Sequence, residues 1–305
     1  MFILIFNQLL KMLLLMLVGV FCARKNLITE EGNRCISNFL LMIVNPCLII
    51  SVYQVDFDSR LAKGLLLSLV AAVIAHILAF IISGVLIRPD GNPEYMLDRY
   101  AAAYSNCGFI GIPLINSVLG SEGVFYLTAF MTVFNILSWT HGLSLIKGKF
   151  EVRHIKEGLM APMVLGAFVA IFLFFTQIHI PSVIMDSMDY IAATNTPLAM
   201  AVAGFSVAQS DIRKLFTNLH FYWIALIKLF LVPFAAILMV RFLNFPEMVA
   251  YTIIIAAACP TATTITMMCI RFNRNYRYSS EIFSFTTVLS MITIPLVMLV
   301  AGAIL

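Results

Sequence analysis

Charged residues are scarce in this sequence. Asp, Glu, Lys and Arg make up 11% of its 305 residues, whereas an ordinary soluble domain has about 25%. Hydrophobic residues make up 62%, and the mean hydropathy is +1.00. A soluble globule of this size could not hide so much apolar surface, because much of its area would still face water. The composition therefore indicates an integral membrane protein. Ten spanning helices would use about 210 to 250 residues, which leaves no room for a separate soluble domain.

Motifs for catalysis and for metal binding are also missing. The sequence has no HExxH, no G-x-S-x-G and no paired aspartates inside an apolar run, so it predicts no enzyme. Its cysteines show neither the pairing of a secreted disulfide framework nor the CxxC spacing of a zinc site. The six are Cys22, Cys35, Cys47, Cys107, Cys259 and Cys269. We expect no cofactor and no metal site. No Asp or Glu lies in the middle of an apolar run. The sequence therefore offers no obvious carboxylate for a proton relay or a sodium site inside the membrane.

Apolar runs separated by short polar linkers predict an all-α integral membrane protein with ten transmembrane helices. The predicted ranges are 3–23, 35–52, 61–87, 100–119, 123–145, 159–178, 183–207, 219–241, 248–270 and 280–304.

Basic residues alternate between the loops that join these ranges. The odd-numbered loops carry 14 of the 19 Lys and Arg residues, the even-numbered loops carry three, and Lys11 and Lys228 lie inside predicted helices. Since Lys and Arg are retained on the cytoplasmic side, this alternation predicts a multi-pass protein of the cell membrane with both termini outside the cytoplasm. The net charge of +4 is explained by this topology, and we expect the lipid bilayer and no nucleic acid as a partner.

Prolines inside the predicted helices recur in two halves of the chain. Asn45-Pro46 is matched by Asn195-Thr196-Pro197, and Pro113 is matched by Pro260. Both separations are close to half the chain. The spacing predicts two five-helix repeats, residues 1–150 and 151–305. Because each contains an odd number of helices, the second repeat is inverted relative to the first.

The fourth and ninth predicted helices carry the features of broken helices. Gly108 and Gly111 precede Pro113 in the run 105–113, and Pro260 lies in the run 256–264. Irregular backbone at membrane depth persists only where it is buried in protein or lines a wet cavity, so two such breaks predict a site near the membrane midplane. The alternative is that these residues merely kink their helices.

The chemistry of this predicted site favours an anion. Each break exposes a helix N-terminus with free amides and a partial positive charge, and nearby Asn and Thr side chains add hydrogen-bond donors. A small carboxylate is the expected substrate. The predicted substrate-binding residues are Asn106, Gly108, Gly111, Pro113, Asn116, Pro260, Thr261, Thr263 and Thr264.

Two ionisable residues lie near the middle of predicted helices. His76 is in the third and Lys228 in the eighth, at equivalent places in the two repeats. An ionisable group at this depth costs at least about 2.5 kcal/mol, so both are candidates for substrate charge balance or proton coupling. The alternatives are a snorkelling lysine and a histidine that is hydrogen-bonded between helices.

The motif around the fourth helix resembles that of the auxin efflux carrier family of membrane transporters. The resemblance covers essentially the whole chain. The residues that carry it are the segment 105–114, Gly120, Glu122, Gly123, the segments 260–264 and 293–295, Gly19, Pro46 and Pro197. One departure is Thr264, a position that is often Asn in the family, which leaves the identity of the substrate open.

This resemblance implies ten helices in two inverted repeats, with helices 4 and 9 crossing near their prolines. Helices 1, 2, 6 and 7 would form a scaffold, often as a homodimer, and helices 3–5 and 8–10 would form a mobile transport domain that works as an elevator. Family substrates are organic anions, namely auxin in plants and malate or malonate in some bacterial members. A channel or a membrane sensor that does not transport remains the alternative function.

Overall fold

The secondary structure of the chain is helical. The computed structural model describes residues 2–89, 91–148, 156, 159–210 and 212–305, and across these ranges it contains helices and one isolated β-bridge. The all-α prediction is confirmed. The first half contains α1 (Phe2–Arg24), α2 (Glu30–Phe39), η1 (Leu40–Val44), α3 (Asn45–Val52), α4 (Ser59–Leu86), α5 (Tyr95–Ala103), η2 (Cys107–Gly111), α6 (Ile112–Leu137), η3 (Ser138–Gly142) and α7 (Leu143–Lys147). The second half contains α9 (Pro162–Thr176), α10 (Ser182–Ala193), α11 (Asn195–Gln209), α12 (Ile212–Thr217), α13 (Leu219–Leu226), η4 (Ile227–Leu231), α14 (Val232–Phe242), α15 (Glu247–Ala258), α16 (Thr264–Arg271) and α17 (Tyr276–Ile304).

Within the described ranges, seven helical stretches are long and apolar enough to cross a membrane. They are Leu4–Arg24, Glu30–Val52, Ser59–Leu86, Cys107–Lys147, Ser182–Gln209, Leu219–Phe242 and Tyr276–Ile304. This supports a multi-pass membrane protein. The apolar helices α9 and α15 are shorter. The count of ten spans and the inverted relation of the two halves stay predictions. Lys149, Arg153 and the predicted boundary at 150 and 151 lie outside the described residues.

Three prolines explain three of the π-helices, which are labelled η. Pro46, Pro113 and Pro233 are each the second residue of an α-helix that directly follows a π-helix, η1, η2 and η4 respectively. A proline has no N–H, and its ring clashes with the carbonyl four residues earlier. Widening the preceding turn to i→i+5 hydrogen bonds relieves that clash and keeps the chain helical. Inside α6, Gly120 has φ 69° and ψ −165°, so the chain bends between the predicted ranges 100–119 and 123–145.

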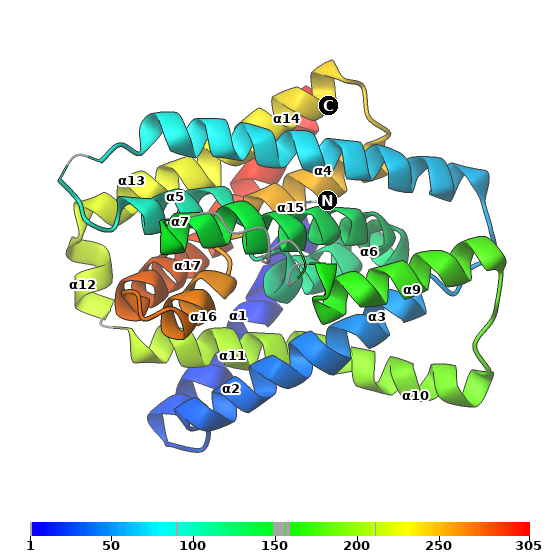
Figure 1. Ribbon diagram of the computed structural model, residues 1–305, viewed down its shortest axis with the longest axis horizontal. Coiled ribbons are helices and arrows are strands. Elements are labelled where there is room, and N and C mark those ends of the chain that lie inside the picture. Colours follow the sequence, from blue (N-terminus) through cyan, green and yellow to red (C-terminus); the bar gives the residue numbers. More distant parts are fainter. Residues whose placement is uncertain (1, 90, 149–155, 157–158, 211) are drawn as a thin grey trace.

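The helices are arranged around a central group. Helices α4, α13 and α14 lie along one side, helices α2, α3, α10 and α11 lie along the opposite side, and α5, α6, α7 and α15 lie between them (Figure 1). The buried core is continuous across these groups. Residues from both halves therefore meet in the centre of the molecule.

Helices α1 and α11 approach each other unusually closely. A Cβ at Gly204 of α11 would overlap the carbonyl oxygen of Met16, and a Cβ at Gly19 of α1 would overlap the carbonyl oxygen of Ala201. Small residues at such an interface allow two membrane helices to pack backbone against backbone.

We expect Gly204→Ala to destabilise the protein, because the added methyl group meets backbone that cannot rotate away. Overpacking of this kind costs about 1–3 kcal/mol. Thermal unfolding of the purified protein in detergent measures the effect. The matched control is Gly302→Ala in α17, where a Cβ would meet no atom within 4 Å. Equal unfolding temperatures for the two variants would contradict the close packing of α1 on α11.

Candidate functional site

Two non-helical segments lie side by side in the core. Residues 104–106 separate α5 from η2, and residues 259–263 separate α15 from α16. The amide of Asn106 donates to the carbonyl of Pro260 at 2.7 Å, and the amide of Ala262 donates to the carbonyl of Tyr104 at 3.0 Å. Ser105 lies opposite Thr261 in an antiparallel bridge. We call residues 104–106 and 260–262 the crossing.

The local sequence explains both interruptions. Pro260 has no N–H with which to continue α15, and Cys259 before it has φ −58° and ψ 148°, as residues before proline favour. Asn106 caps the following helix, because its Oδ1 accepts a hydrogen bond from the amide of Phe109 at 3.4 Å. Pro113 lies within the helical segment that follows, so the chain leaves the helical conformation before the motif 105–113 rather than at its proline.

Lys228 forms hydrogen bonds with both halves of the chain next to the crossing. Its side chain is fully buried in η4, and its ammonium group donates to the hydroxyl of Ser105 and, at 3.0 Å, to the carbonyl of Ala257. These two acceptors belong to different halves of the chain, and both are neutral. The positive charge of the ammonium group is therefore held next to the crossing without neutralisation by either of these partners.

A cavity of about 40 Å³ lies against the crossing. The polar residues that line it are Ser105, Asn106, Asn135, Thr263 and Thr264. The apolar residues that line it are mainly Leu41, Phe109, Met131, Phe134 and Met163. Among the residues that the structure describes, those that line the cavity include no Asp or Glu, so no described carboxylate on its walls repels an anion. Helices η2 and α16 begin at this cavity, and their N-terminal ends bring partial positive charge to it.

Asn106, which lines this cavity, carries an unused hydrogen-bond donor. The residue is 4% exposed, and Nδ2 has no hydrogen-bond partner among the described residues. Its Oδ1 is occupied by the amide of Phe109, which fixes the NH₂ group as the free end of the amide. A buried donor left without a partner costs about 1–3 kcal/mol. An acceptor atom in the cavity would remove that cost.

Six of the nine predicted substrate-binding residues line the cavity or form the crossing. Asn106, Gly108, Thr263 and Thr264 line the cavity. Pro260 and Thr261 form the crossing itself, and the hydroxyl of Thr261 is already used because it donates to the carbonyl of Ala101 at 2.9 Å.

The remaining predicted residues do not line the cavity. Gly111 lies where the two halves of the chain pack closely. A Cβ there would lie 3.4 Å from Cβ of Cys107 and 3.4 Å from Sγ of Cys259. Pro113 is buried in α6, whereas Asn116 in the same helix is exposed.

His76 is brought near the crossing but has a local partner. Its ring is 2% exposed, Nδ1 lies 2.7 Å from the carbonyl of Ala72, and the ring packs on Phe130 with centroids 4.6 Å apart. It does not line the cavity. These contacts are those of a histidine held inside its own helix.

Sequence reasoning missed several residues of the site. Ser105 precedes Asn106 in the motif and could have been included for its hydroxyl. Asn135 lines the cavity, and its Nδ2 donates to the carbonyl of Met131 at 2.8 Å. Tyr100 supports the wall through hydrogen bonds to Thr264 at 2.9 Å and to Ser138 at 2.6 Å. No sequence signal distinguishes Asn135 or Tyr100 from ordinary helix residues.

Comparison with known proteins gives consistent matches along the chain. The sequence model of a family described as membrane transport protein matches residues 4–158 and residues 151–298. The chain is 21% identical over 300 residues to an uncharacterised transporter of Methanocaldococcus jannaschii, with 93% of this chain and 94% of that protein covered. It is 25% identical over 301 residues to an uncharacterised transporter of Methanothermobacter thermautotrophicus, with 94% and 95% covered.

Proposed function

From the premise that this chain belongs to the membrane transport protein family, we propose that it is a secondary transporter that moves a small organic anion with a carboxylate group across the cell membrane. The auxin efflux carrier-like resemblance of the sequence is confirmed by that membership, and a transporter is not an enzyme. The single observation that carries the choice of an anion is the buried NH₂ group of Asn106, which has no partner in the described part of the chain and lies at a cavity with no acidic residue in its described lining.

The charge around the cavity supports this choice. A carboxylate would accept a hydrogen bond from Asn106 and would lie at the N-terminal ends of η2 and α16, where helix dipoles favour negative charge. The buried ammonium group of Lys228 donates a hydrogen bond to Ser105 and so adds a full positive charge next to the crossing. A metal cation would meet the wrong sign of potential at this place.

The size of the cavity supports an alternating-access mechanism. About 40 Å³ holds one or a few water molecules, because one water needs about 10–15 Å³ by this measure, and a dicarboxylate is larger. The walls must therefore separate for the substrate to bind. Leu41 and Met163 come from the predicted scaffold, whereas Asn106 and Thr263 come from the predicted transport domain. Movement of one group against the other, as in an elevator, would open the cavity toward alternate sides.

The proposed transporter has ten helices in two inverted repeats. This arrangement would place η2 and α16 in opposite directions at one site. The hydrogen bond at 2.6 Å between Asn195 and Asn45 joins residues at equivalent places in the two predicted repeats. We include in the proposal a homodimer formed by the scaffold helices, and both termini outside the cytoplasm.

Uptake by proteoliposomes tests the proposed function. Purified protein should catalyse saturable uptake of at least one radiolabelled carboxylate from a panel of dicarboxylates and indole or aryl acids, because a carrier binds its substrate before each turnover. The matched control is the neutral amide of the same acid, which should not be taken up. Flux that rises without saturation would point to the channel, and binding without flux would point to the sensor. Either outcome would overturn the carrier.

A further inference from the structure

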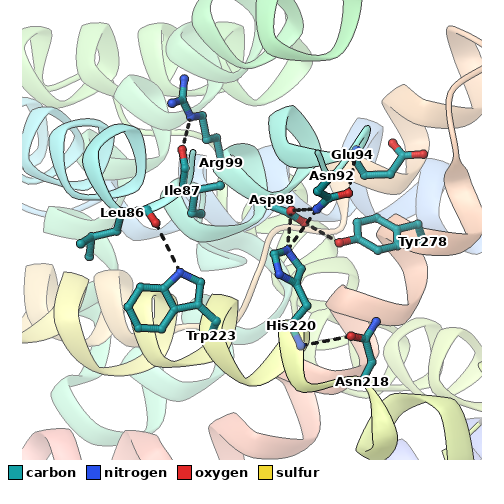
Figure 2. Close-up of polar contacts among 10 residues, drawn as sticks. All are labelled: Leu86, Ile87, Asn92, Glu94, Asp98, Arg99, Asn218, His220, Trp223 and Tyr278. Atoms are coloured by element: carbon teal, nitrogen blue, oxygen red, sulfur yellow. Dashed lines mark hydrogen bonds and ion pairs between the residues drawn. The ribbon is translucent and has the colours of Figure 1, made fainter. Parts of the chain in front are cut away.

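A buried carboxylate lies in a second polar cluster, away from the crossing. Asp98 of α5 has a fully buried side chain. Its Oδ2 accepts hydrogen bonds from Nε2 of His220 and from Nδ2 of Asn92, both at 2.7 Å, and its Oδ1 accepts one from the hydroxyl of Tyr278 at 2.8 Å (Figure 2). We call Asn92, Asp98, His220 and Tyr278 the Asp98 cluster.

Three helices begin at this cluster. Helix α5 starts at Tyr95, helix α13 is capped by Asn218 and helix α17 is capped by Asn275. The two caps accept hydrogen bonds from the amides of His220 at 3.1 Å and Tyr278 at 3.2 Å, which fixes the backbone of both residues. Because helix N-termini carry partial positive charge, the convergence of three of them stabilises the buried carboxylate, which has no lysine or arginine partner among the described residues.

The geometry leaves one nitrogen of His220 ready to accept a proton. Nε2 points at the Asp98 carboxylate, so the N–H is on Nε2 and Nδ1 is the basic nitrogen of the neutral ring. The NH₂ of Asn92 lies 3.2 Å from Nε2, and both groups donate to the same oxygen of Asp98. The His220 side chain is 38% exposed, whereas the Asp98 side chain is fully buried. The histidine, at the start of the stretch Leu219–Phe242, is therefore accessible while the carboxylate stays covered.

The cluster is connected to the crossing through all three helices. Helix α5 leads directly to Ser105 and Asn106, and helix α13 leads to Lys228 in η4. Helix α17 carries Thr286, whose hydroxyl accepts a hydrogen bond from the amide of Thr261 at 3.2 Å. A change at the Asp98 cluster acts on each of the segments that build the crossing.

We propose that Asp98 and His220 form a proton-binding site, and that protonation of His220 at Nδ1 favours anion binding at the crossing. This inference rests on the proposed transport function. Proton uptake converts the hydrogen bond from the neutral His220 ring to the Asp98 carboxylate into an ion pair, and the charge of the cluster changes from −1 to 0. Removing a negative charge from this end of the three helices lowers the repulsion of an approaching anion, and the ion pair holds the helix ends together more firmly.

Other charges around Asp98 do not replace His220 in this role. Burial raises the pKa of the Asp98 carboxyl, and Glu94 raises it further, while the hydrogen bonds from His220 and Tyr278 lower it. The guanidinium of Arg99 is turned away and donates to the carbonyls of Ile87 at 2.9 Å and Gly84 at 3.0 Å. The other charged groups that the structure describes on helices packed against α5 are Arg60 and Lys63 near the start of α4, Arg88 beyond α4, Lys147 in α7, Lys228 in η4, Arg271 in α16, and Arg277 and Glu281 in α17.

Tryptophan fluorescence tests the proton site without any transported substrate. Trp223 lies three residues after His220 on α13, on the same helix face, where an imidazolium would quench it. In a Trp139→Phe background, Trp223 is the only tryptophan left, and its fluorescence should change with pH in one step. His220→Gln should remove the step. Asp98→Asn should alter the step, because the ring would then take up its proton beside a neutral amide instead of a carboxylate.

A control variant and an uptake measurement complete this test. His179→Gln replaces an exposed histidine outside the cluster and should retain the step. A step that persists in His220→Gln would overturn the proton site, whether or not Asp98→Asn folds. Proteoliposome uptake should show a KM that falls as pH falls through the step, and His220→Gln should flatten that profile. A flat wild-type profile despite the step would overturn the link to transport. A step in a protein that moves no carboxylate would overturn the proposed function and leave the proton site standing.

Discussion

Replacing Asn106 with aspartate is expected to abolish saturable anion uptake and leave the protein folded. Asn106→Asp keeps the size of the side chain and keeps the oxygen that caps η2 through the amide of Phe109. It replaces the unpartnered NH₂ group with a carboxylate oxygen at the wall of the cavity. Bringing like charges together in such a site costs several kcal/mol, so KM should rise more than about 100-fold.

A milder substitution separates repulsion from the loss of one hydrogen bond. Asn106→Ala should raise KM about 10- to 100-fold, because a hydrogen bond to a charged group contributes about 1.5–3 kcal/mol. The matched control is Asn244→Asp, the same chemical change at an exposed residue beyond α14. Size-exclusion profiles and thermal unfolding of each variant report folding. Normal uptake by a folded Asn106→Asp variant would show that the anion does not bind at this cavity.

The helices were the most predictable part of the fold. The range 219–241 corresponds to Leu219–Phe242 and the range 61–87 corresponds to Ser59–Leu86, because apolar runs bounded by polar linkers locate such stretches directly. The interior of the stretches was less predictable. The sequence indicates irregular backbone near Pro46 and Pro113, but whether a proline kinks, breaks or widens its helix depends on the neighbours that satisfy the freed groups.

The candidate site was predictable where the motif itself forms it. Asn106 and Gly108 line the cavity because Asn106 ends the interruption and Gly108 lies in the first turn after it. Asn116 does not, because α6 has turned it to an exposed face by then. Asp98 was overlooked for a different reason. It lies before the predicted range 100–119, where a carboxylate is ordinarily solvated, and only contacts with residues 220 and 278, more than 100 positions away, make it buried.

Lys228 should supply much of the attraction that the site exerts on an anion. Its ammonium group is fully buried and is hydrogen-bonded to two neutral oxygens, those of Ser105 and Ala257. A buried charge with neutral partners is costly until an opposite charge comes near, and a bound carboxylate at the crossing would provide that charge. At an effective dielectric constant of about 20, a unit charge about 4–8 Å from the anion contributes about 2–4 kcal/mol.

Lys228→Gln is therefore expected to weaken anion binding about 30- to 1,000-fold, measured as KM for uptake or as Kd from substrate-dependent thermal stabilisation. Glutamine retains a donor for Ser105 or Ala257, so the crossing should stay intact, and the neutral side chain costs less to bury. Lys228→Arg keeps the charge and should retain more affinity.

Lys11→Gln removes a charge from an exposed position on α1 and controls for net charge. His76→Gln compares the second predicted cation, whose ring is already bonded to Ala72 outside the cavity. A larger loss of affinity in His76→Gln than in Lys228→Gln would contradict the assignment of the attractive charge to Lys228.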